Sequence, residues 1–200
     1  MVIMFRVYDY GDQIHPKLIL ILYCFHIYFS LEIILAIVAT LAQALVGLEL
    51  EPQFNEPYLS TSLQDFWGRR WNLMVTSIVR VTIYNPTRSS MTHVNCHKLA
   101  LLLAVFTTFV VSGLMHELIF YYMGRLRSTW EIMCFFLLHG FCLVVEIVLK
   151  KSFFSAGSRW RLPCLISGPL TLGFVIITSL CLFFPQYFRS KVDRGFGEYA

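Results

Sequence analysis

The segment from Cys164 to Phe184 contains no charged side chain and is long enough to cross a membrane as one helix. The hydrocarbon core of a bilayer is about 30 Å thick, and a helix needs roughly 20 apolar residues to cross it. Three more apolar runs of comparable or greater length lie near 18–48, 99–116 and 132–149. In lipid, only helices and closed barrels satisfy every backbone polar group, and runs of this length favour helices. We therefore predict an all-α integral membrane protein with about four transmembrane helices, the last near 164–184.

The composition agrees with this fold class. Of the 200 residues, 57% are hydrophobic and only 14% are charged, which is typical of membrane proteins. The net charge of +4 is spread over the loops, and this suits anionic headgroups or an anionic co-substrate better than nucleic acid. The six cysteines never form a CxxC pair, which argues against a disulfide framework or a zinc ribbon. We predict one membrane-embedded domain over residues 1–200.

The stretch SLQDFWGRRWN, at residues 62–72, is the most polar exception to this pattern. It lies in a motif loop, 51–97, between the first two apolar runs, and its tryptophans suit a membrane interface. Ser60, Thr61 or Ser62 could cap a short helix that begins near Leu63. Apolar residues then recur at 71, 74, 75, 78 and 81. This spacing predicts an interfacial or re-entrant amphipathic helical segment that lies at or dips into the membrane.

His116 lies at the end of the second apolar run. Polar groups at membrane depth are costly and usually mark a pathway or a site. Ser112 precedes it by one helical turn on the same face, whereas Glu117 points about 100° away and need not share its cavity. Gly113 leaves room for a neighbouring helix or a substrate chain. An imidazole is a natural general base for a hydroxyl; the alternative is a histidine that only ends a helix at the interface.

The other histidines give weaker indications. The HELIF sequence that begins at His116 does not fit the HExxH zinc pattern, because its fifth residue is Phe120. His93 and His97 have i,i+4 spacing, but a single pair is too little for a diiron site, and we predict no metal. His139 and Glu146 share a helical face. They could line a polar cavity, as in a small transporter or channel, or be structural residues bonded to neighbouring helices.

The pair SLQDFWGRRWN and SGLMHEL, about forty residues apart, resembles the double signature of the membrane-bound O-acyltransferase superfamily. NEPYLSTSLQDFWGRRWN resembles its plant wax-synthase branch, and the resemblance extends from RVYDY at 6–10 through the fourth span. It implies a tunnel-crossed helical bundle in the endoplasmic reticulum membrane that moves a fatty acyl group from acyl-CoA to a hydroxyl acceptor. It also implies that His116 is the catalytic base and that Asn72 is its upstream partner, with no metal or prosthetic group.

The chemistry of these residues agrees with what the resemblance implies. His116 would accept the proton of a long-chain alcohol as the alcohol oxygen attacks the acyl-CoA thioester, giving a wax ester and free CoA. Asn72 cannot be a base, but its amide can hydrogen-bond the thioester carbonyl or position the acceptor.

Further positions of the two motifs make up a predicted substrate-binding set. Arg69 and Arg70 suit the CoA phosphates, with headgroup anchoring as the alternative. Asp65 could simply pair with one of these arginines, and Trp67 and Trp71 could belong to an interfacial belt. The complete set is Asp65, Trp67, Arg69, Arg70, Trp71 and Ser112.

One departure from the superfamily pattern matters for function. Its members usually have additional spans before the region with which this chain begins, so we expect the chain to correspond to the C-terminal part of such an enzyme. The alternatives to a wax-ester-forming enzyme are an acyl-CoA-dependent sterol or diacylglycerol O-acyltransferase, and a non-catalytic truncated partner of full-length acyltransferases. The residues leave the acyl chain length and the oligomeric state open.

Overall fold

The computed structural model describes residues 16–47, 52–91, 97–124, 129–155 and 163–186. All regular secondary structure in these ranges is helical, which confirms the predicted all-α fold class. Four helices in the described part of the chain are long and apolar enough to cross a membrane. Their apolar windows are Tyr28–Leu45, Lys98–Tyr122, Glu131–Ser152 and Cys164–Gln186.

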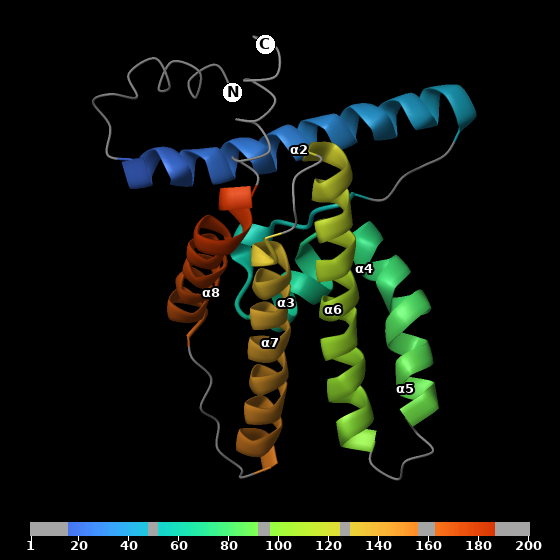
Figure 1. Cartoon of the computed structure of the whole chain (residues 1–200), viewed down its shortest axis with the longest axis vertical. Coiled ribbons are helices and arrows are strands. Elements are labelled where there is room, and N and C mark those ends of the chain that lie inside the picture. The colour runs from blue at the N-terminus through green and yellow to red at the C-terminus, as the bar shows by residue number, and fades with distance from the viewer. Residues whose placement is uncertain (1–15, 48–51, 92–96, 125–128, 156–162, 187–200) are drawn as a thin grey trace.

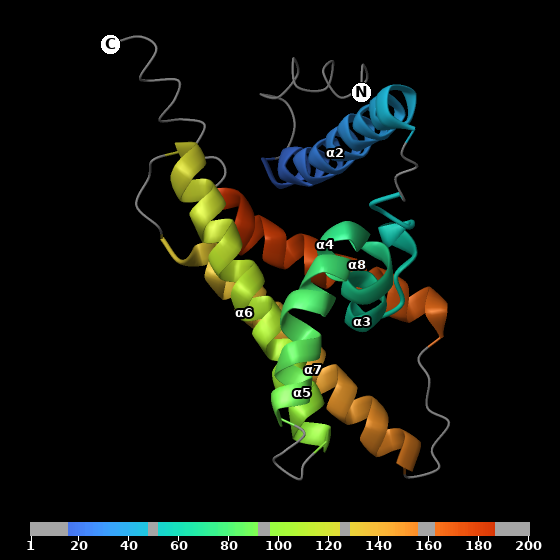
Figure 2. The ribbon, with the colours of Figure 1, turned by 90° about the vertical axis from the view of Figure 1, so that its right-hand side faces the viewer.

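The helices follow one another as one long helix, a series of short ones and three long ones. The long helix α2 (Pro16–Val46) comes first. The short segments are η2 (Pro57–Leu59), α3 (Leu63–Asp65), η3 (Phe66–Arg70), α4 (Leu73–Val79), η4 (Arg80–Tyr84) and α5 (Asn85–Met91). The last three are α6 (His97–Gly124), α7 (Glu131–Ser155) and α8 (Cys164–Thr178), which continues into η5 (Ser179–Phe183). Helices α5, α6 and α7 run side by side, and α2 crosses the end of this bundle (Figures 1 and 2).

Three of the short segments are π-helical turns. η3, η4 and η5 have the wider i→i+5 hydrogen-bonding pattern, and each adds one broad turn to a neighbouring α-helix. Such turns occur frequently at functional sites.

The hydrophobic core lies between α6 and α7. Its buried side chains are mostly aromatic and belong to these two helices: Phe109, Phe120, Ile132, Phe135, Phe136, Leu143 and Ile147. Gly113 and Gly140 allow the helices to approach closely. A Cβ on Gly113 would lie 2.6 Å from Met133 Sδ, which confirms that Gly113 makes room for a neighbouring helix.

Gly140→Ala is expected to destabilise this helix pair. The added Cβ would lie 2.8 Å from Phe109 Cβ, an atom that cannot move without α6. Overpacking of this kind costs about 1–3 kcal/mol, so we expect a lower thermal unfolding temperature in detergent. Gly173→Ala in α8 is the matched control, because nothing lies within 4 Å of its added Cβ. Equal unfolding temperatures for the two variants would contradict the proposed close contact.

Helix α6 continues past His116 to Gly124, beyond the end of the predicted second span. The charge of Glu117 does not end the helix because the carboxylate is buried and bonded: Oε1 accepts from Met133 N at 3.1 Å and Oε2 accepts from Gln186 Nε2 at 3.3 Å. The first of these bonds satisfies an N–H in the first turn of α7, where a negative charge is also favourable. His116 therefore lies inside a continuous helix and not at a helix end.

The predicted amphipathic segment is helical from Leu73 to Met91, through α4, η4 and α5. Its apolar side chains Met74, Ile78 and Val81 are each more than half exposed. Their outward face suits contact with lipid, as the spacing predicts for a segment that lies at the membrane.

Candidate functional site

The motif SLQDFWGRRWN folds into two short helical pieces, and its first and last polar residues are both caps. Ser62 is the N-cap of α3, and its Oγ accepts from Asp65 N at 3.2 Å, which confirms one of the predicted caps. Asn72 has a left-handed backbone, with φ 46° and ψ 64°, and its Oδ1 accepts from Val75 N at 3.3 Å. Asparagine tolerates this conformation better than most residues, so Asn72 both turns the chain and starts α4.

Two polar side chains of α7 fix the start of the motif. Leu63 N donates to Glu146 Oε2 at 3.0 Å, and Lys150 Nζ donates to Ser62 Oγ at 3.2 Å. Lys150 also forms an ion pair with Glu146, one turn away on the same helix. Glu146 is therefore a structural residue bonded to a neighbouring segment, one of the two alternatives predicted for it.

Arg70 closes the far end of the motif. Its Nε donates to Asp65 Oδ2 at 2.8 Å, which confirms the predicted alternative that Asp65 pairs with an arginine. Its Nη1 donates to the backbone oxygens of Asn55 at 3.3 Å and Glu56 at 3.1 Å. The guanidinium thus ties the motif to the chain that leads into it, whereas Arg69 is exposed.

Both motif tryptophans lie among aromatic rings. Trp71 stacks on Phe66, with ring centroids 5.4 Å apart, and lies 6.2 Å from Tyr28 of α2. Trp67 packs edge-on against Phe135 of α7 at 6.3 Å. Each indole is partly buried and contributes to the wall of a cavity, so neither is only a surface anchor.

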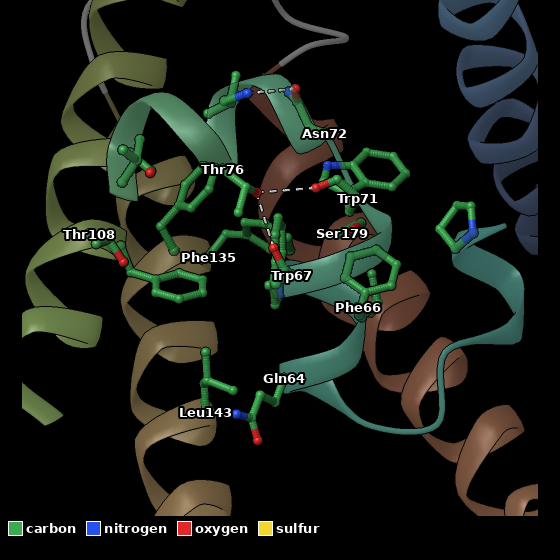
Figure 3. A pocket seen from close by; sticks show the side chains of 18 of the residues that line it. Gln64, Phe66, Trp67, Trp71, Asn72, Thr76, Thr108, Phe135, Leu143 and Ser179 are labelled. Carbon is green, nitrogen blue, oxygen red and sulfur yellow. Dashed lines mark hydrogen bonds between the residues drawn. The ribbon is translucent and has the colours of Figure 1, made fainter. Parts of the chain in front are cut away.

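The cavity has a volume of about 1050 Å³ and lies between the motif, α4–α5 and the long helices (Figure 3). Its walls are mainly aromatic and aliphatic, and polar side chains project from several elements. Apart from tyrosines and tryptophans, the polar lining residues are Gln64, Asn72, Thr76, Arg80, Asn85, Arg88, Thr108, Ser112, His116 and Ser179. Ligand cavities are typically apolar with a few converging polar groups, and this one is large enough for a long lipid chain.

His116 has a defined ring orientation in this cavity. Its Nδ1 lies 2.7 Å from the backbone oxygen of Ser112. A carbonyl oxygen can only accept, so Nδ1 carries the hydrogen and Nε2 keeps the lone pair of the neutral ring. The ring also lies against Phe136, with centroids 4.6 Å apart. His116, which the sequence predicts to be a base, is thus held with Nε2 as its basic atom.

The structure brings Asn72, Trp67, Trp71, Ser112 and His116 to one cavity. The remaining members of the predicted substrate-binding set are Asp65, Arg69 and Arg70, and none of them belongs to the described residues that line it.

Sequence reasoning missed Arg80 and Arg88, which do line the cavity. Their eight-residue spacing, with Tyr84 midway between them, was the available signal, although Arg88 lies beyond the predicted amphipathic spacing at 71–81. Arg69 and Arg70 give the stronger sequence signal because they lie inside the aromatic motif.

No group of three or more potential metal ligands occurs within the described ranges. His93, one member of the predicted histidine pair, lies outside the described residues.

Comparison with known proteins supports the motif assignment. Residues 50–138, which include both Asn72 and His116, match the membrane bound O-acyl transferase family. The chain is 53% identical over 200 residues to acyl-CoA–sterol O-acyltransferase 1 of Arabidopsis thaliana, covering all of this chain and 57% of that protein. It is 47% identical over 188 residues to the long-chain-alcohol O-fatty-acyltransferase of Simmondsia chinensis, covering 94% of this chain and 53% of that protein.

A third relative is the probable long-chain-alcohol O-fatty-acyltransferase 3 of Arabidopsis thaliana, 46% identical over 197 residues. The match covers 96% of this chain and 56% of that protein. The chain therefore spans a little over half the length of the curated relatives that it matches. The predicted resemblance to the superfamily, and to its plant wax-synthase branch, is confirmed by these matches.

Proposed function

We propose that this chain, whose residues 50–138 match the membrane bound O-acyl transferase family, transfers a fatty acyl group from acyl-CoA to a long-chain alcohol. One observation carries the proposal: Asn72 and His116 come from separate elements and line the same large, mainly apolar cavity. Two hydrocarbon chains need apolar walls, and the reacting thioester and hydroxyl need a few polar groups between them.

In the proposed reaction, His116 is the general base. Its Nε2 accepts the hydroxyl proton as the alcohol oxygen attacks the thioester carbonyl carbon. The new C–O bond forms, the C–S bond breaks, and the imidazolium returns the proton to the departing CoA sulfur. This base chemistry requires neither a metal nor a prosthetic group, and acyl-CoA acts as the co-substrate.

Asn72 has the role of an oxyanion donor in this proposal. Its Oδ1 is used by the cap bond to Val75 N, so the Nδ2 hydrogens are what the side chain can offer to a ligand. A donor fixed in advance and aimed at a developing oxyanion is among the larger contributions to catalysis.

We assign the CoA phosphates to Arg80 and Arg88. Both line the cavity, and guanidinium binds phosphate oxygens in bidentate fashion. Arg70 is committed to Asp65 and to two backbone oxygens, so its contribution is to hold the motif. Arg69 is exposed, which suits the alternative role of anchoring to lipid headgroups.

Replacing Arg80 and Arg88 together by alanine should raise the KM for acyl-CoA by about tenfold or more, because hydrogen bonds to charged groups contribute about 1.5–3 kcal/mol. The kcat should change little, since neither arginine faces the reacting atoms in this proposal. KM for palmitoyl-CoA at low and high salt is the measurement. Lys151→Ala, which removes an exposed cation at the end of α7, is the control. An equal rise in KM for the control would mean that only net charge matters.

A sterol is the second candidate acceptor. A relative that is 53% identical to this chain is named a sterol O-acyltransferase. The general-base chemistry at His116 is the same for a sterol hydroxyl and a primary alcohol, so the shape of the cavity wall would make the selection.

The protein is a membrane protein, and we propose the endoplasmic reticulum membrane as its location, as the family resemblance implies.

The deciding experiment uses membranes from a host that lacks its own neutral-lipid acyltransferases and expresses this chain. They receive labelled palmitoyl-CoA with hexadecanol, a sterol or diacylglycerol, each in a separate assay. Label in wax ester, lost with His116→Ala, supports the main proposal.

The other results of this assay select among the alternatives. Label in sterol ester or triacylglycerol would replace the proposed acceptor while keeping the reaction. If no ester forms although the protein is present and inserted in the membrane, the proposed acyltransferase activity is contradicted. A role as a non-catalytic partner would then be favoured.

A further inference from the structure

His139 of α7 is completely buried, and both of its ring nitrogens have a partner. Trp67 Nε1 donates to His139 Nδ1 at 3.1 Å. On the other side of the ring, His139 Nε2 lies 2.8 Å from Thr178 Oγ1 in α8. One histidine therefore joins the motif segment, α7 and α8, three parts of the chain that are far apart in the sequence.

The chemistry of the partners fixes every proton in this chain of hydrogen bonds. An indole N–H can only donate, so His139 Nδ1 must be the unprotonated acceptor. Nε2 then carries the hydrogen of the neutral ring and donates it to Thr178 Oγ1. The Thr178 hydroxyl in turn donates a hydrogen bond to the backbone oxygen of Phe174, at 2.7 Å. If His139 were protonated, its Nδ1–H and the indole N–H of Trp67 would both be donors and would face each other without an acceptor. This arrangement therefore requires the neutral ring.

Trp67 leads from His139 to both predicted catalytic residues. Its ring lies 6.2 Å from Phe136, and Phe136 in turn lies against His116 at 4.6 Å. Its backbone oxygen accepts from Thr76 Oγ1 at 3.2 Å (Figure 3). Thr76 N in turn donates to the backbone oxygen of Asn72 at 3.0 Å. The placement of Trp67 thus bears on the surroundings of both groups, through its indole toward His116 and through its backbone oxygen toward Asn72.

We propose that His139 is a positioning residue of the acyl-transfer site: it holds Trp67, and through Trp67 it sets the placement of His116 and Asn72. The inference rests on the proposed function. His139 is not among the described residues that line the cavity, so it acts through Trp67 and does not touch the substrates. His139 contributes to the reaction rate by fixing geometry, because small displacements of reacting groups lower the rate strongly.

Two amide replacements separate the two halves of the contact. His139→Asn places Oδ1 near the position of the ring Nδ1, where it can accept from Trp67. His139→Gln instead places an amide donor near Nε2, where it can reach Thr178 but leaves the indole without its acceptor. The site geometry should therefore survive in His139→Asn and be lost in His139→Gln.

Steady-state kinetics form the first test. We expect His139→Gln and Trp67→Phe to lower kcat by roughly 10- to 100-fold with KM for palmitoyl-CoA nearly unchanged. His139→Asn should restore most of the lost kcat. Thr178→Val should lower kcat, because the imidazole Nε2–H then has no acceptor and the ring is no longer held with an unprotonated Nδ1 toward Trp67. Thr171→Val is its matched control, because the Thr171 hydroxyl donates to the backbone oxygen of Ser167 within α8. Equal losses of kcat in the Asn and Gln variants, or full activity in the Gln variant, would overturn the proposal.

Nuclear magnetic resonance of isotope-labelled histidines provides a readout that does not need turnover. The His116 ring signals are identified by their loss in His116→Ala. They should shift in His139→Gln and in Trp67→Phe but stay in place in His139→Asn. Unshifted His116 signals in both of the first two variants would overturn the positioning role.

The two readouts keep the failure of this inference apart from the failure of the proposed function. If the unsubstituted chain forms no ester, the proposed function fails, while the resonance shifts still decide whether His139 controls the placement of His116. If ester is formed and the His116 signals do not shift in the His139→Gln variant, only the positioning role of His139 fails.

Discussion

His116→Ala is expected to lower acyl transfer by roughly 10²- to 10⁴-fold, the contribution that a positioned general acid or base usually makes. The structure supplies the reason: the hydrogen on Nδ1 is directed at the backbone oxygen of Ser112, so Nε2 is left as the basic atom of a ring that lines the cavity. Alanine removes that atom and leaves the helix backbone intact. Ester formation from labelled palmitoyl-CoA and hexadecanol, in membranes with matched protein levels, measures the loss.

Leu118→Ala is the matched control for this variant. It removes a similar amount of side chain from the same stretch of α6, but Leu118 is 57% exposed and is not among the described residues that line the cavity. Its activity should stay near that of the unsubstituted chain. Retained ester formation in His116→Ala, at equal membrane insertion, would exclude His116 as the base.

Replacing Asn72 tests a residue that has both a structural and a proposed chemical role, so three variants are needed. Asn72→Gly accepts the left-handed backbone and removes the amide, whereas Asn72→Ala removes the amide and adds backbone strain. Asn72→Asp keeps the oxygen that caps α4 and loses the N–H donors. If the amide donates to the thioester oxygen, the Gly and Asp variants should both lose roughly 10²- to 10³-fold in kcat.

The alternative pattern is equally distinct. If Asn72 matters only as a turn and a cap, Asn72→Asp should retain activity, because aspartate is an equally good cap. Asn72→Gly should then lose little, and Asn72→Ala should be the poorest of the three. Thermal unfolding in detergent, measured for all three variants, separates strain from a loss of chemistry.

The features that the sequence predicts well are those set by local composition. Four long apolar helices follow from four runs of apolar residues, because lipid leaves the backbone few other choices. The cap at Ser62 follows from the preference of helix starts for a hydroxyl. The motif pair also predicts that Asn72 and His116 serve one site, and both do line one cavity.

The features that could not be predicted depend on partners distant in the sequence. The two side chains that fix His139 are Trp67, 72 positions earlier, and Thr178, 39 positions later. No periodicity within α7 contains that information, so the sequence leaves both a structural and a cavity-lining role open for this histidine. The length of α6 could not be predicted for the same reason. Glu117 is accommodated within the helix because Met133 N and Gln186 Nε2 donate hydrogen bonds to its carboxylate.

The π-helical turn η4 has a consequence for how this segment tolerates insertions and deletions. In a regular α-helix, residues eight positions apart are offset by about 80° around the axis. A turn with i→i+5 bonding spreads more residues over each revolution, which reduces that offset and brings Arg80 and Arg88 toward one side of the helix. Deleting one residue between them would place the two arginines seven positions apart in a regular α-helix, an offset of only about 20°, so both would stay on the side that faces the cavity. The π turn η4 therefore accommodates one residue more than a regular α-helix would need, while both arginines keep to the same side of the segment.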